Sequence, residues 1–278
     1  MNFFIIKSPT RNIDDLVSEI LRNNHSVFIQ EAVWARDLES EETIRILEEE
    51  FDLEYSELQI GWRKVEVAEW ACALSHHKAY QSAMKMGRYQ EWICVIEDDV
   101  KLLPDFFDRV EALEKIKFHN PTIIQLFTRG KRFASIDKKI SALNPTLFAA
   151  DFPPGQTALY LINRPALVNA TSFTKGMGDS DWPLWGRKSK FLMSYPWVGI
   201  EYAAGTTLPV YERTRAEYYR WLFKVLMAVE YKKWRNKGLS YGDYFYYLIY
   251  PAYLRFLHKL GVYKSYNYSD PNSIWLKK

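Results

Sequence analysis

Short apolar runs alternate with longer stretches of helical spacing along the chain. Residues 3–6 are all apolar and end at Lys7-Ser8-Pro9, which is typical of a buried parallel strand that opens an α/β domain. A second apolar run of five residues, 92–96, leads directly into three carboxylates. The other strand candidates are residues 27–29, 122–127 and 158–162.

Between these runs, apolar residues recur every three or four positions, as they do on the buried side of a helix. Residues 12–23 carry such a stripe that ends in Ile20 and Leu21, with Asn12 as the expected N-cap. Residues 65–86 have helical spacing up to Gly87, a common helix stop. Further helices are expected over residues 40–51, residues 104–118 and from Pro165 onward. This alternation predicts an α/β fold with a mostly parallel sheet covered on both faces.

Charge divides the chain into two parts. Residues 1–212 contain 24 Lys and Arg against 30 Asp and Glu, a net charge of −6, whereas residues 213–278 contain 13 against 4, a net charge of +9. The second part also contains 12 of the 19 tyrosines. We therefore expect one acidic domain over residues 1–212 and a basic, aromatic-rich helical tail over residues 213–278 with an anionic partner.

The tail has the pattern of a helix that lies on a membrane surface. Residues 214–237 combine an apolar stripe with surrounding Lys, Arg, Tyr and Trp, which fits the surface of an anionic membrane. Packing of this stripe on the body, or a homodimer contact, remains an alternative. Nucleic acid is not an expected partner, because the body is acidic.

Several classes of protein are excluded by what the sequence lacks. Two cysteines, Cys72 and Cys94, do not make a disulfide framework or a four-cysteine zinc site. No apolar run approaches the roughly 18 residues of a spanning helix, and the first residues do not read as a signal peptide. These features favour the cytoplasm.

The segment WICVIEDDV, residues 92–100, is the most informative one for chemistry. In open α/β sheets, ligands bind at the carboxyl ends of the strands, where Glu97, Asp98 and Asp99 are expected. Three adjacent carboxylates after a buried strand need positive charge, and their hard oxygens suit Mg²⁺ or Mn²⁺. The alternative is a solvated acidic loop.

A second segment, AEWACALSHHKAY, contains polar residues at helical spacing. On a helix, Glu69, Cys72, His76 and Tyr80 share one face. Cys72 and His76 could bind zinc in principle, but no second pair of ligands is close in sequence, so we expect His76 to have a structural role. Glycine-rich phosphate loops and the motifs GxSxG and HExxH are absent from the sequence.

These two segments together resemble glycosyltransferase family 25, which contains bacterial lipooligosaccharide galactosyl- and glucosyltransferases and collagen galactosyltransferases. The segment EWACALSH (69–76) is similar to the family's GEIGCALSH motif, and VIEDDV (95–100) to its strand ending in EDD. SPTR (8–11), FIQEAV (28–33) and GQTALYLI (155–162) extend the resemblance over about residues 1–205. Ala68 departs from the family's glycine, and Asp179 and Asp181 compete for its single later aspartate.

The resemblance implies a GT-A-like domain that binds a nucleotide-sugar donor with the help of Mn²⁺ or Mg²⁺. Asp99 would bind the cation, Glu97 would support it or face the nucleotide, and Asp98 would orient the sugar. Such a cation stabilises the negative charge of the departing diphosphate. The other expected donor-binding residues are Pro9, Arg11, Val33, Arg63, Glu69 and Lys78.

The resemblance also implies an inverting reaction, in which a carboxylate removes the proton of the acceptor hydroxyl. Asp181 is the first candidate for this base, Asp179 the second and Glu201 the third. The expected acceptor-binding residues are Gln156, Thr157, Trp182 and Trp185, although core packing is an equal alternative for the two tryptophans.

The expected function is therefore transfer of galactose or glucose from a UDP-sugar to a lipid-linked lipooligosaccharide or lipopolysaccharide glycan. We expect the enzyme on the cytoplasmic face of the inner membrane. The alternatives are a non-catalytic membrane-associated binding protein with the same fold and a metal-dependent phosphohydrolase that uses the same acids.

Overall fold

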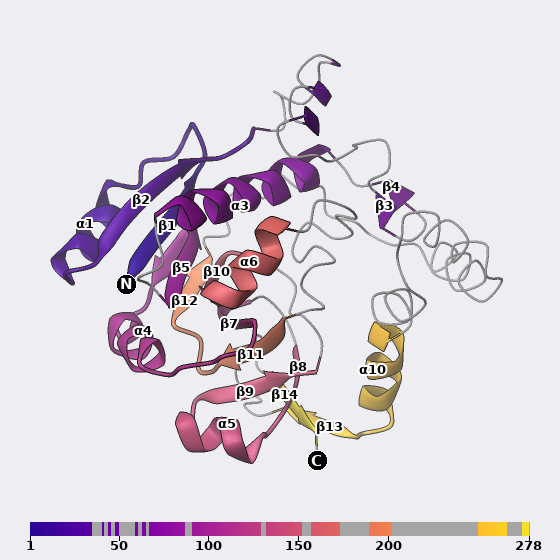
Figure 1. The fold of residues 1–278 in the computed structure, drawn as a ribbon. Coiled ribbons are helices and arrows are strands. Elements are labelled where there is room, and N and C mark those ends of the chain that lie inside the picture. Colours follow the sequence, from indigo (N-terminus) through magenta and orange to yellow (C-terminus); the bar gives the residue numbers. More distant parts are fainter. Residues whose placement is uncertain are drawn as a thin grey trace.

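The protein contains a large sheet with helices on both faces (Figure 1). The computed structural model describes residues 1–34, 67–86, 91–128, 132–151, 157–172, 189–201, 250–265 and 274–277, and a few positions between 41 and 64. The strands of the large sheet are β1 (Asn2–Lys7), β2 (Ser26–Glu31), β5 (Trp92–Glu97), β7 (Thr122–Phe127), β8 (Arg132–Ser135), β9 (Leu147–Ala150), β10 (Leu159–Asn163), β11 (Lys190–Ser194), β13 (Tyr263–Ser265) and β14 (Ile274–Lys277).

Two short strand pairs and six helices complete the described elements. The pairs are β6 (Val100–Leu102) with β12 (Gly199–Glu201), and β3 (Gln59–Ile60) with β4 (Arg63–Lys64). The helices are α1 (Asp14–Arg22), α3 (Val67–Lys85), α4 (Phe106–Glu114), α5 (Lys138–Leu143), α6 (Arg164–Ser172) and α10 (Tyr250–Lys259).

The ten strands have the order β13-β14-β8-β9-β11-β7-β10-β5-β1-β2. Their pairings make seven strands point one way and three, β9, β10 and β13, the other way, as expected of a mostly parallel sheet. The sequence did not indicate the reversals. β10 lies antiparallel between β5 and β7, so the fold is mixed α/β.

The local predictions are largely confirmed. All five predicted strands form, and helices form within residues 65–86 and 104–118 and at Pro165. At the first helix, Asn12 is not the N-cap: that position is Ile13, and Asn12 Oδ1 accepts a hydrogen bond from the backbone N–H of Asp14 at 2.7 Å. Leu21 is 54% exposed, so the apolar stripe is narrower than predicted. The predicted helix over residues 40–51 lies mostly outside the described residues.

The two faces of the sheet have separate cores. α3 and α6 lie against each other over one face, where Phe4, Val95 and Tyr160 are buried (Figure 1). The opposite face packs against α1, α4 and α5, whose Ile20, Phe106 and other apolar residues enter a larger cluster. Because helices cover both faces of the sheet, the strands are apolar along their whole length in the sequence.

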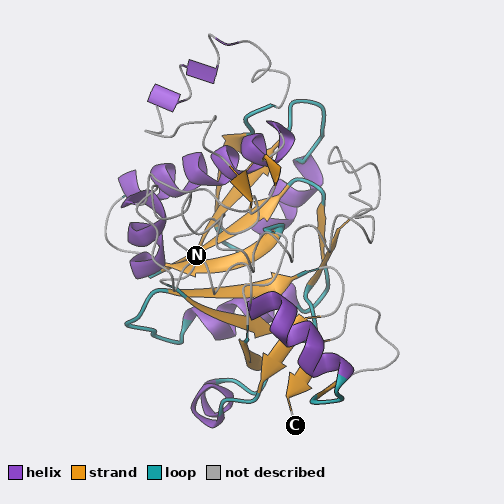
Figure 2. Cartoon of the chain, turned by 90° about the vertical axis from the view of Figure 1, so that its right-hand side faces the viewer, coloured by secondary structure: helices purple, strands orange, loops and turns teal. Residues whose placement is uncertain are grey.

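The last described residues return to the large sheet. β14 pairs in parallel with β8, and the Tyr263 hydroxyl donates a 2.7 Å hydrogen bond to Asp151 Oδ2. Figure 2 shows α10 beside these last strands. Residues 213–278 were predicted to form a helical tail, and their described part contains the helix α10 and the strands β13 and β14. The proposed domain boundary near residue 212 lies outside the described residues.

In the part of the chain that the structure describes, every helix is too short or too polar to cross a bilayer.

Candidate active site

Strand alternation directs Glu97 toward α3. Successive side chains of a strand point to opposite faces, so Val95 and Glu97 of β5 share a face, and Tyr160 lies opposite Val95 on β10. This is the face that α3 covers, and His76 of α3 contacts the Glu97 carboxylate. The acidic end of β5 therefore meets the polar residues of α3.

A cavity of about 520 Å³ opens at this point, at the carboxyl ends of β1, β2 and β5. Ligands bind at this edge in open α/β sheets. Its lining comes from the segments that follow these strands and from the first half of α3. The lining residues are Ile6, Ser8, Thr10, Arg11, Ala32, Val33, Trp34, Ala68, Ala71, Cys72, Ser75, His76, Glu97, Asp98 and Asp99.

Asp98 connects the end of β5 to the turn after β1. Its Oδ2 accepts two hydrogen bonds of 2.6 Å, from the backbone N–H and from the hydroxyl of Ser8. Its Oδ1 accepts a bond from Arg11 Nη1 at 3.2 Å. These three bonds hold the carboxylate in place and fix the position of the turn that carries Arg11.

Asp99 is less completely paired than Asp98. Its Oδ2 lies 3.2 Å from Arg11 Nη1, whereas its Oδ1 is buried and has no hydrogen-bond partner among the described residues. Burial and the charge of Glu97 raise the pKa of Asp99 in spite of the nearby Arg11 guanidinium. A buried carboxylate oxygen without a partner suits a divalent cation, so Asp99 fits the ion that the acidic motif predicts.

Glu97 is held by two partners. Its Oε1 lies 3.0 Å from His76 Nε2 and accepts a 3.1 Å bond from the Thr157 hydroxyl. Burial raises the pKa of Glu97, but these hydrogen bonds, the charge of His76 and the charge of Arg11 outweigh it, so the pKa is lowered overall. Glu97 is therefore ionised at neutral pH.

His76 joins Glu97 to two buried tyrosines. Its Nδ1 lies 2.9 Å from the Tyr160 hydroxyl, which lies 2.6 Å from the Tyr80 hydroxyl. In a neutral ring, Nε2–H donates to the ionised Glu97, so Nδ1 accepts from Tyr160. Burial raises the pKa of both tyrosines, which keeps them protonated.

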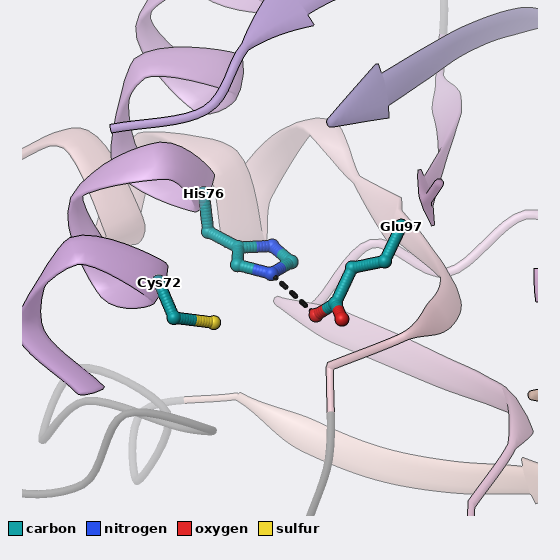
Figure 3. Close-up of side chains that lie close together, drawn as sticks. All are labelled: Cys72, His76 and Glu97. Atoms are coloured by element: carbon teal, nitrogen blue, oxygen red, sulfur yellow. Dashed lines mark hydrogen bonds and ion pairs between the residues drawn. The ribbon is translucent and has the colours of Figure 1, made fainter. Parts of the chain in front are cut away.

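Cys72 lies one turn before His76 on the same side of α3. Figure 3 shows its sulfur, the His76 ring and the Glu97 carboxylate directed toward one another. Each offers a ligand atom, and these atoms lie within 4.8 Å of one another. The sequence offered no second pair of ligands close to Cys72 and His76, and the fold brings one further candidate, Glu97, to them.

The other predicted donor residues occupy different positions. Arg11 and Val33 line the cavity, and the Val33 N–H donates a 2.8 Å bond to the Ser75 hydroxyl. Pro9 lies in the exposed turn between Ser8 and Thr10. Lys78 is half-buried on α3 and is not among the described residues that line the cavity.

Several predicted residues lie outside the described residues. These are Asp179, Asp181, Gln156, Trp182 and Trp185, together with the side chains of Arg63 and Glu69. The third base candidate, Glu201, is described. It lies on β12 opposite Val100, the residue after Asp99.

The sequence matches the model of the family described as glycosyltransferase family 25 (LPS biosynthesis protein) over residues 9–152, which is 144 of the 278 residues. The chain belongs to glycosyltransferase family 25. The matched segment includes α3, β5 and every described residue that lines the cavity except Ile6 and Ser8.

Two solved structures are distantly similar to this family 25 protein. One is the crystal structure of a glycosyltransferase involved in the glycosylation of the major capsid of PBCV-1, with 13% identity, a TM-score of 0.33 and coverage of 67% of this chain and 66% of that chain. The other is A197 from STIV, with 10% identity, a TM-score of 0.33 and coverage of 76% and 98%. This chain thus spans just under two thirds of the first protein's length. Both likenesses are too weak to bear on function, and no curated protein matches the sequence.

The sequence did not identify all the polar partners in the site of this family 25 protein. The spacing of Cys72, His76 and Tyr80 indicated a shared helix face, and that is confirmed by the contacts of His76 and Tyr80 with Tyr160. Tyr160 itself was not predicted as a partner. Its position depends on the register between β5 and β10, which local spacing does not specify.

Proposed function

We propose that the protein is an inverting hexosyltransferase of GT-A type that moves galactose or glucose from a UDP-sugar to a lipid-linked lipooligosaccharide or lipopolysaccharide glycan. The observation that supports it is the acidic end of β5 in a cavity of about 520 Å³, where Asp99 has a buried oxygen that no other described residue bonds, and Arg11 lies beside it. Negative and positive groups are thus adjacent where a diphosphate and its cation would bind.

The donor half of the reaction is assigned to the described residues. Asp99, assisted by Glu97, would hold Mn²⁺ or Mg²⁺, and the cation would neutralise charge on the departing diphosphate. Arg11 is about one third exposed and bonds to both aspartates, so it can turn from them to a phosphate oxygen. Asp98 would have two roles: it would hold the turn after β1 in place, and it would contact the sugar of the donor.

The roles on the acceptor side of the reaction are proposed from the resemblance to glycosyltransferase family 25. Asp181, or else Asp179, would remove the proton from the acceptor hydroxyl while its oxygen attacks the anomeric carbon from the side opposite UDP, which inverts the configuration. Glu201 is the third candidate. Gln156, Thr157, Trp182 and Trp185 would contact the acceptor, although Thr157 also donates to Glu97.

The test is transfer from a panel of UDP-sugars in Mn²⁺, with and without lipooligosaccharide acceptor, followed by NMR of the product's anomeric configuration. We expect one hexose to be transferred with inversion. Hydrolysis of the donor without transfer to the acceptor would favour the phosphohydrolase. Donor binding without turnover would favour the non-catalytic binding protein.

The base is tested by isosteric substitution. Asp181→Asn keeps the shape and removes the basicity, so transfer should fall by on the order of 10² to 10⁴ with donor affinity nearly unchanged. Asp179→Asn is the matched control and should have a smaller effect. A larger loss for Asp179→Asn would exchange the two roles, and no loss for either would direct attention to Glu201.

We also propose that the basic segment 214–237 binds the anionic inner-membrane surface from the cytoplasmic side, with each engaged Lys or Arg contributing roughly 1 kcal/mol. Because β14 belongs to the large sheet, truncation would remove a strand, so the test uses the full chain. The triple variant Lys232→Gln, Lys233→Gln and Arg235→Gln should sediment less with phosphatidylglycerol vesicles than wild type. Equal sedimentation of both proteins, or equal binding to neutral vesicles, would favour packing on the body or a homodimer contact.

A further inference from the structure

We propose that Cys72, His76 and Glu97 form a site for a thiophilic transition metal of the zinc class. The site is separate in chemistry from the Asp99 position, because Mg²⁺ and Mn²⁺ prefer oxygen ligands whereas zinc-class ions accept thiolate and imidazole. The inference does not depend on the donor or acceptor assigned above.

The geometry brings three ligands of suitable type together. Cys72 and His76 are four residues apart on α3 and therefore project from the same side of the helix, and Glu97 ends β5 opposite them. Their ligand atoms lie within 4.8 Å of one another. Around an ion bound at about 2.0–2.3 Å, tetrahedral ligands are separated by roughly 3.3–3.8 Å, so small side-chain rotations would close the site.

The His76 ring is already oriented for this role. Nε2 faces Glu97 while Nδ1 is engaged with the Tyr160 hydroxyl, and metal-binding histidines commonly have such a second partner. On binding, the neutral ring changes tautomer: the proton leaves Nε2 for Nδ1, and Nδ1–H then donates to the Tyr160 hydroxyl. The Cys72 thiol loses its proton, so metal binding releases one proton to the solvent.

The site opens into the cavity. Cys72, His76 and Glu97 all line it, and three protein ligands leave a fourth position for water or another small ligand. An ion at this position would bind the Glu97 carboxylate, which could then no longer assist Asp99 in holding a cation. The site is thus placed where its occupancy would affect the cavity that we assign to the donor.

The test is titration of the full chain with Co²⁺, whose bond to a thiolate absorbs in the near ultraviolet. We expect this absorbance in the wild type, its loss on addition of Zn²⁺, and its absence in Cys72→Ser. His76→Gln should weaken Co²⁺ binding by at least about 10-fold. Asp99→Asn is the matched control and should retain the absorbance, because Asp99 is not a ligand of this site.

A second measurement needs no substitution. Cys94 is buried, whereas Cys72 is half-buried and lines the cavity, so iodoacetamide should react first with Cys72. Zn²⁺ should slow that reaction, and Mg²⁺ should not. The proposal is overturned if the wild type gives no thiolate absorbance with Co²⁺, if Cys72→Ser retains it, if Asp99→Asn abolishes it, or if Zn²⁺ does not protect Cys72.

Discussion

The two faces of the large sheet are built from different kinds of contact. Toward α1 and α4, the core consists of interlocking aliphatic and aromatic side chains such as Ile20, Phe106 and Val110. Toward α3, a chain of hydrogen bonds runs through the core from Tyr80 through Tyr160 and His76 to Glu97. The apolar packing of the first face stabilises the fold. The hydrogen bonds of the second face hold the side chains of the candidate site in position.

The covering helices differ in the same way. α1 is strongly amphipathic, whereas the apolar and polar residues of α3 are hardly separated into faces. An amphipathic helix has one buried stripe, while a helix without such a stripe can be buried on several sides. Trp70, Leu74 and His76 of α3 are all buried, so this helix lies deep enough to bring polar groups to the sheet.

The largest effect on stability is expected on the apolar face. Phe106 is fully buried and packs against Phe3 and Phe107, so Phe106→Ala should lower the free energy of unfolding by about 3–5 kcal/mol, measured by urea denaturation. Phe107→Ala is the matched control and should cost less, because Phe107 is only partly buried. If both variants lost the same free energy of unfolding, the burial of a side chain in this core would not determine the cost of removing it.

On the other face, Asp99→Asn should affect binding more than stability. Removing the charge should weaken UDP binding in Mn²⁺ by at least about 10-fold in calorimetry. The free energy of unfolding at neutral pH should not fall, because the raised pKa of Asp99 means that its charged form is disfavoured in the folded protein. Unchanged UDP affinity in Mn²⁺ would remove Asp99 from the metal site.

Tyr160→Phe tests the hydrogen-bond chain. The substitution keeps the ring and removes the hydroxyl that lies between His76 and Tyr80, which should cost about 1–3 kcal/mol of stability in thermal or urea unfolding. Tyr80→Phe removes only the end of the chain and should cost less. A neutral Tyr160→Phe would mean that the polar chain does not stabilise this face.

The smallest effect on stability is expected at an apolar residue of α1 that lies outside the buried stripe of the helix. Leu21 is 54% exposed, so Leu21→Ala should change the free energy of unfolding by no more than about 0.5 kcal/mol. Its neighbour Ile20 is fully buried, and Ile20→Ala should cost about 2–5 kcal/mol. Similar costs for the two substitutions would contradict the described orientation of α1.

The sequence predicted local features better than distant pairings. Apolar runs identified β1, β5 and β7 because a strand covered on both faces is apolar along its whole length. The acidic motif was correctly expected at a strand end, and Arg11, which was predicted as a donor-binding residue, pairs with two of its acids.

The unpredicted features all depend on pairings between remote segments. The antiparallel direction of β10 sets Tyr160 beside His76, and the return of β14 to β8 changes the interpretation of the basic tail. Neither pairing leaves a local pattern in the sequence. Likewise, the Cys72 and His76 pair appeared incomplete because Glu97 is more than twenty residues away along the chain.

The pairing of β14 with β8 has a consequence for a cleaved chain. Ile274 of β14 lies opposite Arg132 of β8. A single protease cut in the chain, at any position between these two residues, would leave them on different fragments, but their strands would still be hydrogen-bonded to each other. Buried Ile274 and Leu254, and the bond from Tyr263 to Asp151, would resist dissociation of the shorter fragment. A nicked protein should therefore run as two bands on a denaturing gel and still elute as one species from a sizing column.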